Sequence, residues 1–296
     1  MMCDLIMIVG PTAVGKTNLS IELAKVFDGE IINADAMQFY KGLNIGTAKI
    51  KEDQKQDIVH HLLDFLNPEE AFSVVEYQKL VREKVEEIKR KKKCPIIVGG
   101  SGLYLSSIID DYKFFGKERD SVLNEKYLDF STEELAKMLL DTKPLLAKKC
   151  DLSNRRRVLR ALEKNDSDVQ KELKPFYDNA VIIGLETERN LLYKRIDCRV
   201  DEMINSGLEK EVKSLYDRNI VGQSVQAIGY KEFYEYFEGN YSKEKTIELI
   251  KRNSRRYAKR QMTWFKNKMN VTWFNVNFDN FSNTIEEITK YIKKIS

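Results

Sequence analysis

The sequence predicts an α/β fold: a P-loop parallel sheet covered by helices, with a mainly helical insertion. Short runs rich in Ile and Val alternate with helical patterns, and this alternation is typical of parallel strands joined by crossover helices. The first apolar run is followed at once by a glycine-rich loop of the form G-x-x-x-x-G-K-T and then by a helical pattern. That order is the one a phosphate-binding unit needs.

Five short apolar runs are expected to form the strands. They are Leu5–Val9, Glu30–Ala34, Pro95–Val98, Val181–Leu185 and Val271–Val276. Helical periodicity predicts helices over Thr17–Phe27, Ser73–Lys92 and Phe281–Lys294. In parallel sheets, ligands bind at the carboxyl ends of the strands, so we expect the functional site at that edge.

A chain of 296 residues is long for one simple domain, so we expect a core with an insertion. No strand pattern is evident between residues 110 and 168, and Thr132–Leu140 and Arg155–Lys164 have helical patterns. We therefore assign the core to residues 1–112 and 176–296 and the insertion to 113–175. The next stretch, 187–240, has helical patterns with breaks at Gly207, Gly222 and Gly239, and residues 200–245 could pack with the insertion.

Composition argues against several classes of protein. The net charge of +4, from 50 basic and 46 acidic residues, does not by itself identify a nucleic-acid-binding protein. The four cysteines form no C-x-x-C pair, which predicts reduced thiols, and the adjacent His60 and His61 are expected to be structural. No apolar run is long enough to cross a bilayer, and the chain starts in a strand without a basic leader. We therefore expect a cytoplasmic protein with no membrane partner.

The glycine-rich loop predicts a site for a diphosphate or polyphosphate. Its backbone N–H groups and the positive end of the following helix dipole converge on an anion. Lys16 can neutralise the outer phosphate, and the Thr17 hydroxyl can ligate Mg²⁺. The residues of the loop are Gly10, Pro11, Thr12, Ala13, Val14, Gly15, Lys16 and Thr17.

Two further features fall at the same edge of the sheet. Asp35 ends the second strand, where its carboxylate could accept a proton from a nucleophile or hold Mg²⁺. The third strand ends in Gly99–Gly102, where a hydrolysing P-loop enzyme usually has a Mg²⁺-binding aspartate. This pattern favours an enzyme in which the bound diphosphate is a leaving group or a donor.

Basic residues concentrate in two predicted helices. Arg156 and Arg160 lie one turn apart on one helix face. Residues 251–268 contain eight Lys or Arg and no acid, with Tyr257, Trp264 and Phe265 between them. We expect the aromatic side chains to pack in the core. We expect the arginines to contact phosphate, because an acid-free basic stretch repels itself without an anionic partner.

Taken together, these segments resemble the tRNA dimethylallyltransferases, the bacterial-type tRNA isopentenyltransferase family that prenylates an adenosine beside the anticodon. The resemblance covers almost the whole chain, and its most specific part is the Asp-x-x-Gln-x-Tyr segment followed by Gly-Thr-Ala-Lys. The matching segments are Gly10–Thr17, Asn33–Lys49, His60–Asp64, Val98–Tyr104, Asn154–Glu163, Ala227–Glu232 and Ala258–Phe265.

The resemblance implies a reaction. Dimethylallyl diphosphate would bind the loop with Mg²⁺, held by Lys16 and Thr17. The dimethylallyl group would pass to the exocyclic amine of the adenosine 3′-adjacent to the anticodon, flipped out of the tRNA loop, and diphosphate would leave. Asp35 would take the proton from that amine, so the implied catalytic residues are Asp35, Lys16 and Thr17. The resemblance also leads us to expect a monomer.

The resemblance further implies a set of tRNA-binding residues. These are Asp35, Ala36, Met37, Gln38, Ser101, Arg119, Arg156, Arg157, Val158, Leu159 and Arg160. Three departures from the family pattern bear on this set. Ser101 stands where relatives usually have Thr, and we expect its polar role to survive. Gln226 stands where they usually have Arg, so a cationic contact is lost or moved to Lys231. Residues 111–129 are shorter and more charged than in relatives.

Three alternative functions stay open. The chain could prenylate free AMP, or it could be a P-loop small-molecule kinase that binds ATP and uses a lid of arginines such as Arg195 and Arg199. The third is an RNA-binding NTPase switch, against which the missing second Mg²⁺-binding aspartate argues. The long basic C-terminal helix favours a polynucleotide acceptor over AMP.

Overall fold

The computed structural model describes residues 3–110, 126–148, 150–163 and 175–295. The chain divides into two compact units, one formed by Met1–Asp110 with Pro175–Ser296 and the other by Asp111–Lys174. Residues 200–245, which could have belonged with the insertion, lie in the first unit, where their helices pack on α8 and α11.

The first unit contains a six-stranded sheet in the order β3-β2-β4-β1-β5-β6, and every pair of neighbouring strands is parallel. The strands are β1 Leu5–Val9, β2 Gly29–Asn33, β3 His60–His61, β4 Cys94–Val98, β5 Ala180–Glu186 and β6 Thr272–Asn275. The α/β prediction is confirmed, and each of the five predicted strands lies within one residue of its expected ends. Strand β3 was missed because it is a two-residue edge strand of half-buried histidines with no apolar run to mark it.

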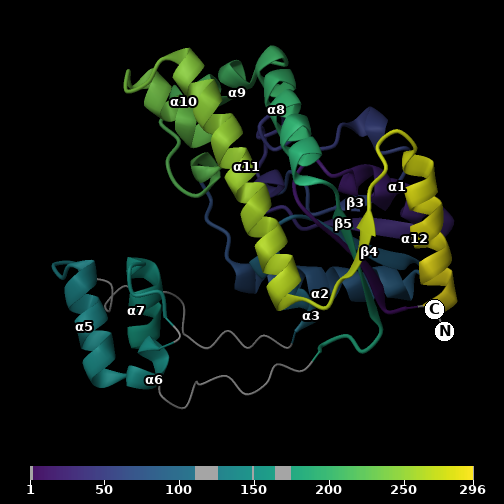
Figure 1. Cartoon of the computed structure of the whole chain (residues 1–296), viewed down its shortest axis with the longest axis horizontal. Helices are drawn as coiled ribbons and strands as arrows, with labels where there is room; N and C mark the ends of the chain where they lie inside the picture. Colours follow the sequence, from purple (N-terminus) through teal and green to yellow (C-terminus); the bar gives the residue numbers. More distant parts are fainter. Residues whose placement is uncertain (1–2, 111–125, 149, 164–174, 296) are drawn as a thin grey trace. The chain divides into compact units, whose positions relative to one another are not determined.

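The helices of the first unit cover both faces of this sheet (Figure 1). They are α1 Lys16–Val26, α2 Val74–Arg90, α3 Gly102–Ile109, α8 Arg189–Asn205, α9 Leu208–Tyr216, α10 Tyr230–Phe237, α11 Lys243–Lys268 and α12 Phe281–Ile295. Short 3₁₀ helices lie at Ala36–Phe39 (η1), Glu52–Gln54 (η2) and Ser224–Gln226 (η4). The predicted breaks at Gly207, Gly222 and Gly239 fall between these helices, as expected.

Strand β1 shows why the sequence has continuous apolar runs. Its side chains alternate between two cores: Leu5, Met7 and Val9 pack in the cluster that includes α2 and α3, while Ile6 and Ile8 pack in the cluster that includes α1 and α12. All five are fully buried, because a parallel sheet has helices on both faces. This burial fixes the sheet, so the loops at its carboxyl edge start from rigid supports.

The second unit is helical in its described residues, 126–148 and 150–163, which contain no strand. Its helices are α5 Thr132–Thr142, α6 Pro144–Ala147 and α7 Arg155–Glu163. Helix α5 begins with a capping box in which the Ser131 hydroxyl accepts the Glu134 N–H at 3.2 Å and the Glu134 carboxylate accepts the Ser131 N–H at 2.7 Å. Leu135, Leu139 and Val158 form the centre of its small core.

Candidate active site

The glycine-rich loop joins β1 to α1 and has a backbone that only glycine adopts easily. Gly10 has φ +141° and Gly15 has φ +102°, both in the left-handed region. A Cβ on Gly10 would lie 2.6 Å from the Leu185 carbonyl oxygen on β5, so a side chain there would also clash. The loop therefore wraps tightly around the start of α1, and its backbone faces the end of the sheet.

Lys16 is the first residue of α1 and folds back over this loop. Its ammonium donates to the Gly10 carbonyl at 3.0 Å and to the Pro11 carbonyl at 2.7 Å. Removal from water and the nearby Arg199 guanidinium lower the pKa of Lys16 to about 7, while Asp35 opposes that shift. The loop thus holds a cation whose charge is only partly stabilised until an anion arrives.

A cavity of about 480 Å³, here called the first cavity, opens beside the loop. Residues 12–18 line one side, and Asp35 and Glu202 are the carboxylates that face it. Four cations also line it: Lys16, Lys194, Arg195 and Arg199. An excess of positive charge beside exposed loop amides suits an anion with several oxygens, such as a diphosphate.

Two arginines of α8 reach the loop from across the cavity. The Arg199 guanidinium donates to the Thr12 hydroxyl at 3.2 Å, and the Arg195 guanidinium donates to the Ala13 carbonyl at 3.1 Å. Arg195 also stacks on the Phe278 ring, 3.8 Å from its centroid. The sequence reasoning named these arginines only for a rival kinase. Their four-residue spacing on one helix face was the signal that could have placed them at the phosphate loop.

Helix α11 supplies a second set of contacts that the sequence reasoning missed. The buried Gln261 amide accepts the Thr12 N–H at 2.9 Å and donates to the Gly100 carbonyl at 3.0 Å. One side chain therefore ties the phosphate loop to the glycine loop after β4. Nothing in the local sequence of Gln261 marks it, because both of its partners are more than 150 residues away in the chain.

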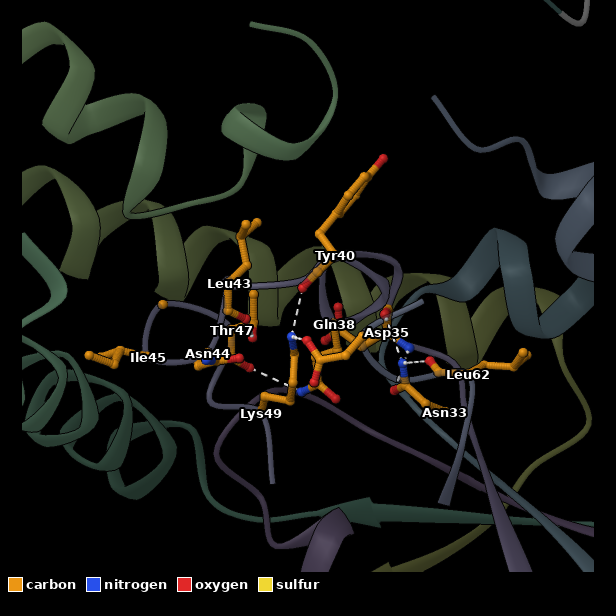
Figure 2. A network of polar contacts seen from close by, with 12 residues as sticks. Asn33, Asp35, Gln38, Tyr40, Leu43, Asn44, Ile45, Thr47, Lys49 and Leu62 are labelled. Atoms are coloured by element: carbon orange, nitrogen blue, oxygen red, sulfur yellow. Dashed lines mark hydrogen bonds and ion pairs between the residues drawn. The ribbon is translucent and has the colours of Figure 1, made fainter. Parts of the chain in front are cut away.

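Asp35 lies two residues after the end of β2, and the Asn33 side chain holds its backbone N–H and its carbonyl (Figure 2). The Asn33 side chain accepts the Asp35 N–H at 3.0 Å and donates to the Asp35 carbonyl at 3.1 Å. The Asp35 carboxylate caps η1 by accepting the Met37 N–H at 3.1 Å. Burial raises the pKa of Asp35, against the effects of the Met37 N–H, Lys16 and Arg199. The result is a fixed carboxylate with enhanced affinity for a proton.

A second cavity of about 330 Å³ lies on the other side of Asp35. It shares four residues with the first cavity: Thr12, Asp35, Arg199 and Tyr257. Much of the remaining wall is apolar and comes from η1, α8, α9, α11 and the segment before α10. These apolar residues are Met37, Ile196, Val200, Met203, Leu208, Ala227, Ile228 and Ile250. Asp35 thus lies where a cationic cavity and a largely apolar cavity meet.

The segment after Asp35 is fixed by its own network of polar contacts (Figure 2). The Lys49 side chain, 3% exposed, donates to the Tyr40 carbonyl at 2.7 Å and pairs with the Asp64 carboxylate at 2.5 Å. The Gln38 side chain donates to the Thr47 carbonyl at 3.0 Å. This network connects the Asp-x-x-Gln-x-Tyr part of the motif with the Gly-Thr-Ala-Lys part. The contacts therefore depend on the number of residues between the two parts.

The structure places the predicted acceptor residues around Asp35. Ala36, Met37 and Ser101 line the second cavity, and the Ser101 hydroxyl accepts the Ala36 N–H at 3.4 Å. Gln38 lines the first cavity instead. Within the loop, residues 12–17 line the first cavity, whereas Gly10 and Pro11 are buried and serve Lys16 through their carbonyls. Thr17 is exposed at the rim of that cavity.

The predicted RNA-contacting helix α7 belongs to the second unit. Its Arg156, Arg157 and Arg160 side chains are exposed. Val158 is fully buried in the core of that unit and Leu159 is half-buried, so their side chains stabilise the helix. Arg119 lies outside the described residues, as does most of the segment 111–129.

The argument from self-repulsion in α11 is corrected by the structure. Three of the eight basic residues in 251–268 pair with acids from distant parts of the chain: Lys251 with Asp201 at 2.6 Å, Arg255 with Asp197 at 2.5 Å and Lys266 with Glu186 at 2.7 Å. The acids come from α8 and β5, so the local sequence of α11 did not reveal them. Phe265 is fully buried, as predicted for the aromatic residues, but Tyr257 lines both cavities.

The histidines and cysteines are placed as the sequence suggested. His61 contacts the buried Glu30 carboxylate at 2.7 Å, and His60 contacts the Ile58 carbonyl at 2.8 Å. All four cysteines lie within the described residues, and none of them forms a disulfide bond. Within the described residues, no group of three His, Cys, Asp or Glu could hold a metal ion, and no helix is long and apolar enough to cross a membrane.

Comparison with known proteins assigns the chain to a family. Residues 38–268 match the family model described as IPP transferase. The chain belongs to the IPP transferase family. The tRNA dimethylallyltransferase of Bacillus subtilis (strain 168) is 50% identical over 283 residues, which cover 92% of this chain and 90% of that protein. That of Anoxybacillus flavithermus (strain DSM 21510 / WK1) is 48% identical over 297 residues, 97% of this chain and 96% of that protein.

Solved structures of IPP transferase relatives have the same fold. The tRNA isopentenylpyrophosphate transferase of Bacillus halodurans is 44% identical with a TM-score of 0.75, and the match covers 98% of this chain and 97% of that one. A eukaryotic dimethylallyltransferase acting on tRNA is 27% identical with a TM-score of 0.83, and the match covers 96% of this chain and 77% of that one. The resemblance read from the motifs is confirmed.

One departure from the usual IPP transferase pattern can now be located. Gln226, which stands where relatives usually have Arg, lines the second cavity. Lys231 and Arg260 line the same cavity. Positive charge is therefore present there despite the glutamine, partly from the lysine that the sequence suggested and partly from α11.

Proposed function

We propose that this chain transfers a dimethylallyl group from dimethylallyl diphosphate to the exocyclic amine of the adenosine 3′-adjacent to the anticodon in tRNA. The observation that carries the proposal is the position of Asp35 on the wall shared by the two cavities. A donor in one cavity and an acceptor in the other would meet at a carboxylate.

The first cavity would hold the diphosphate of the donor. Amides of residues 13–17, with Lys16, Arg195 and Arg199, supply donors and positive charge in this site. Charge develops on the diphosphate as it leaves, so these groups stabilise the transition state more than the ground state. The apolar wall of the second cavity would exclude water from the allylic carbon as its positive charge grows.

The second cavity would receive the flipped adenine. The exocyclic nitrogen attacks C1 of the dimethylallyl group, the N–C1 bond forms, and the bond from C1 to the diphosphate oxygen breaks. The nitrogen becomes acidic as that bond forms, and its proton passes to the Asp35 carboxylate. Tyr257, on the shared wall, offers an aromatic face beside this position.

Mg²⁺ fits the rim of the first cavity. Thr17 is exposed there and presents a hydroxyl, the hard oxygen ligand that Mg²⁺ accepts. Mg²⁺ in such sites is bound by one or two protein oxygens, with phosphate oxygens and water as the other ligands, so the lack of an acidic cluster among the described residues is no obstacle. When bound, the ion would offset negative charge on the diphosphate.

The tRNA would be held mainly through its phosphates. The exposed Arg156, Arg157 and Arg160 on α7 suit such contacts, because guanidinium groups pair with phosphate oxygens without reading sequence.

The direct test is incubation of the chain with labelled dimethylallyl diphosphate, Mg²⁺ and unmodified tRNA, with AMP as a parallel acceptor. We expect label to enter tRNA at the adenosine beside the anticodon and not to enter AMP. Label in AMP alone would identify the chain as an AMP prenyltransferase. Consumption of ATP with nucleosides, without prenyl transfer, would identify a kinase.

A further inference from the structure

Glu211 on α9 has a carboxylate that accepts four hydrogen bonds. One oxygen, Oε2, accepts the Asn44 N–H at 2.9 Å and the Ile45 N–H at 2.8 Å. The other, Oε1, accepts the Gly46 N–H at 3.0 Å and the Tyr230 hydroxyl at 2.6 Å. Three consecutive backbone amides converge on one side chain that is more than 160 residues away in the sequence. Such charge-assisted bonds are about twice as strong as neutral ones.

These contacts join two neighbouring segments of the chain that line the second cavity. Gly46 and Thr47, from the loop after η1, line one part of it, and Leu208 and Gly229, at the starts of α9 and α10, line another. Glu211 lies on α9, one turn after Leu208, and binds the loop at Gly46. The position of the loop against α9 therefore depends on this carboxylate.

The packing beneath the Glu211 carboxylate restricts the position of the loop at Gly46. Tyr230 is fully buried, and its ring lies so close to Gly46 that an added Cβ would be 2.5 Å from Cε2. The Leu208 side chain approaches the same point, with Cδ1 at 2.9 Å. The loop thus rests on the Tyr230 ring while its amides are held by Glu211.

The loop that contains residues 44–46 is hydrogen-bonded to the segment that begins at Asp35. Figure 2 shows Asn44, Ile45 and Thr47 in one turn beside Gln38 and Lys49. The Lys49 N–H donates to the Asn44 carbonyl at 2.9 Å, and the Gln38 side chain donates to the Thr47 carbonyl at 3.0 Å. A shift of residues 44–46 would therefore move the residues around Asp35.

We propose that Glu211 is a positioning residue for the acceptor. It holds the loop 44–46 against α9 and α10, and so fixes the shape of this part of the second cavity and the place of the acceptor base relative to Asp35. This proposal rests on the proposed function, because it assigns the second cavity to the acceptor. None of residues 44–46 lines the diphosphate cavity, and its cations Lys16 and Arg199 are held by the phosphate loop and not by the loop 44–46, so KM for the donor should depend little on Glu211.

The test compares three variants of the full chain in steady-state prenyl transfer. Glu211→Gln keeps the shape of the side chain but turns an amide NH₂ towards backbone N–H donors, so at least one hydrogen bond is lost. Tyr230→Phe keeps the ring against Gly46 and removes only the hydroxyl. Glu209→Gln is the matched control, because Glu209 lies on the same helix and pairs only with Lys243 among the described contacts, at 2.5 Å.

For Glu211→Gln we expect kcat/KM for tRNA to fall about 10- to 100-fold, with KM for dimethylallyl diphosphate within about twofold of wild type. For Tyr230→Phe we expect kcat/KM for tRNA to fall about 3- to 10-fold, since one of the four hydrogen bonds is lost. Hydrogen exchange at the amides of residues 44–46 should be faster in both variants. Glu209→Gln should match wild type in all three measurements.

Three outcomes would overturn the proposal in different ways. Unchanged kcat/KM for tRNA in Glu211→Gln, with faster amide exchange, would show that the contact holds the loop without positioning the acceptor. A matching rise of KM for the donor would show a general structural role. If wild type modifies no tRNA at all, the proposed function fails, and the positioning role of Glu211 toward the acceptor fails with it, even where hydrogen exchange confirms the contact.

Discussion

The two cavities that meet at Asp35 have linings of different chemical character. The first is lined by backbone amides of one tight loop and by cations from α1 and α8, while much of the second is lined by apolar side chains from five separate segments. The turn of the loop in the first cavity is set by glycines within one short motif, although distant side chains also hold it, whereas the second cavity is formed by helices that meet only in the folded chain. A phosphate site can therefore be read from a short motif, whereas an acceptor site is a property of the whole fold.

The largest effect is expected where the two cavities meet. Asp35→Asn removes the proton acceptor but keeps the shape of the side chain, and its amide oxygen can still accept the Met37 N–H. We expect the rate of prenyl transfer to fall about 10²- to 10⁴-fold, with little change in donor or tRNA affinity.

Single-turnover rates and equilibrium binding, measured separately, check this expectation. Asp53→Asn, in the exposed η2 turn, is the matched control and should behave as wild type. A variant at Asp35 with a near-normal rate would remove this carboxylate from the role of base.

The next effect concerns the cationic wall of the first cavity. Arg199→Met removes the guanidinium that donates to Thr12 and faces Asp35, so charge on the leaving diphosphate is less well stabilised. We expect kcat to fall about 100-fold. Arg189→Met is the control on the same helix, since Arg189 is exposed and contacts only Tyr193 among the described contacts. Equal losses in both variants would show a general effect on α8.

A pH effect should be specific to the first cavity. The pKa of Lys16 is about 7 in the free site, and a bound diphosphate would raise it. Donor binding then takes up a proton above pH 7, so affinity should fall by up to about tenfold per pH unit from pH 7 upward and depend little on Lys16 below it. Calorimetry with a thiolodiphosphate analogue of the donor measures this.

Lys16→Arg is the control for the pH effect, because arginine stays charged throughout this range. The titration of the ligand itself is common to both proteins and cancels in the comparison. Parallel pH profiles for wild type and Lys16→Arg would show that Lys16 does not titrate on binding.

The smallest effect is expected from the second unit, which would hold tRNA by charge alone. Arg156→Ala together with Arg160→Ala should weaken tRNA binding about tenfold and reduce the salt slope of log Kd by about two. Lys137 is an exposed cation on α5 of the same unit, and Lys137→Ala tests whether the loss of tRNA binding depends on where the removed charge lies. If binding is unchanged at every salt concentration, these arginines are not phosphate contacts.

The same contrast explains how much the sequence could predict. Strands such as Leu5–Val9 were found because burial on both faces gives an unbroken apolar run, and the phosphate loop because its glycines adopt positive φ within a short motif. Gln261 and Glu211 were not assigned to the site, since each acts on a loop far away in sequence and no local pattern records that distance. Arg199 was named only for a kinase, because its spacing from Arg195 shows a shared helix face but not the loop that this face contacts. The acids that neutralise α11 were missed for the same reason.

The most direct measurement is a crystal structure of the chain with a thiolodiphosphate analogue of the donor and an unmodified anticodon stem–loop. We predict that the diphosphate binds against residues 12–17 and Arg199. We also predict that the adenine lies in the second cavity with its exocyclic nitrogen within hydrogen-bonding distance of Asp35. A complex with both ligands in one cavity, or with the amine turned away from Asp35, would contradict these predictions.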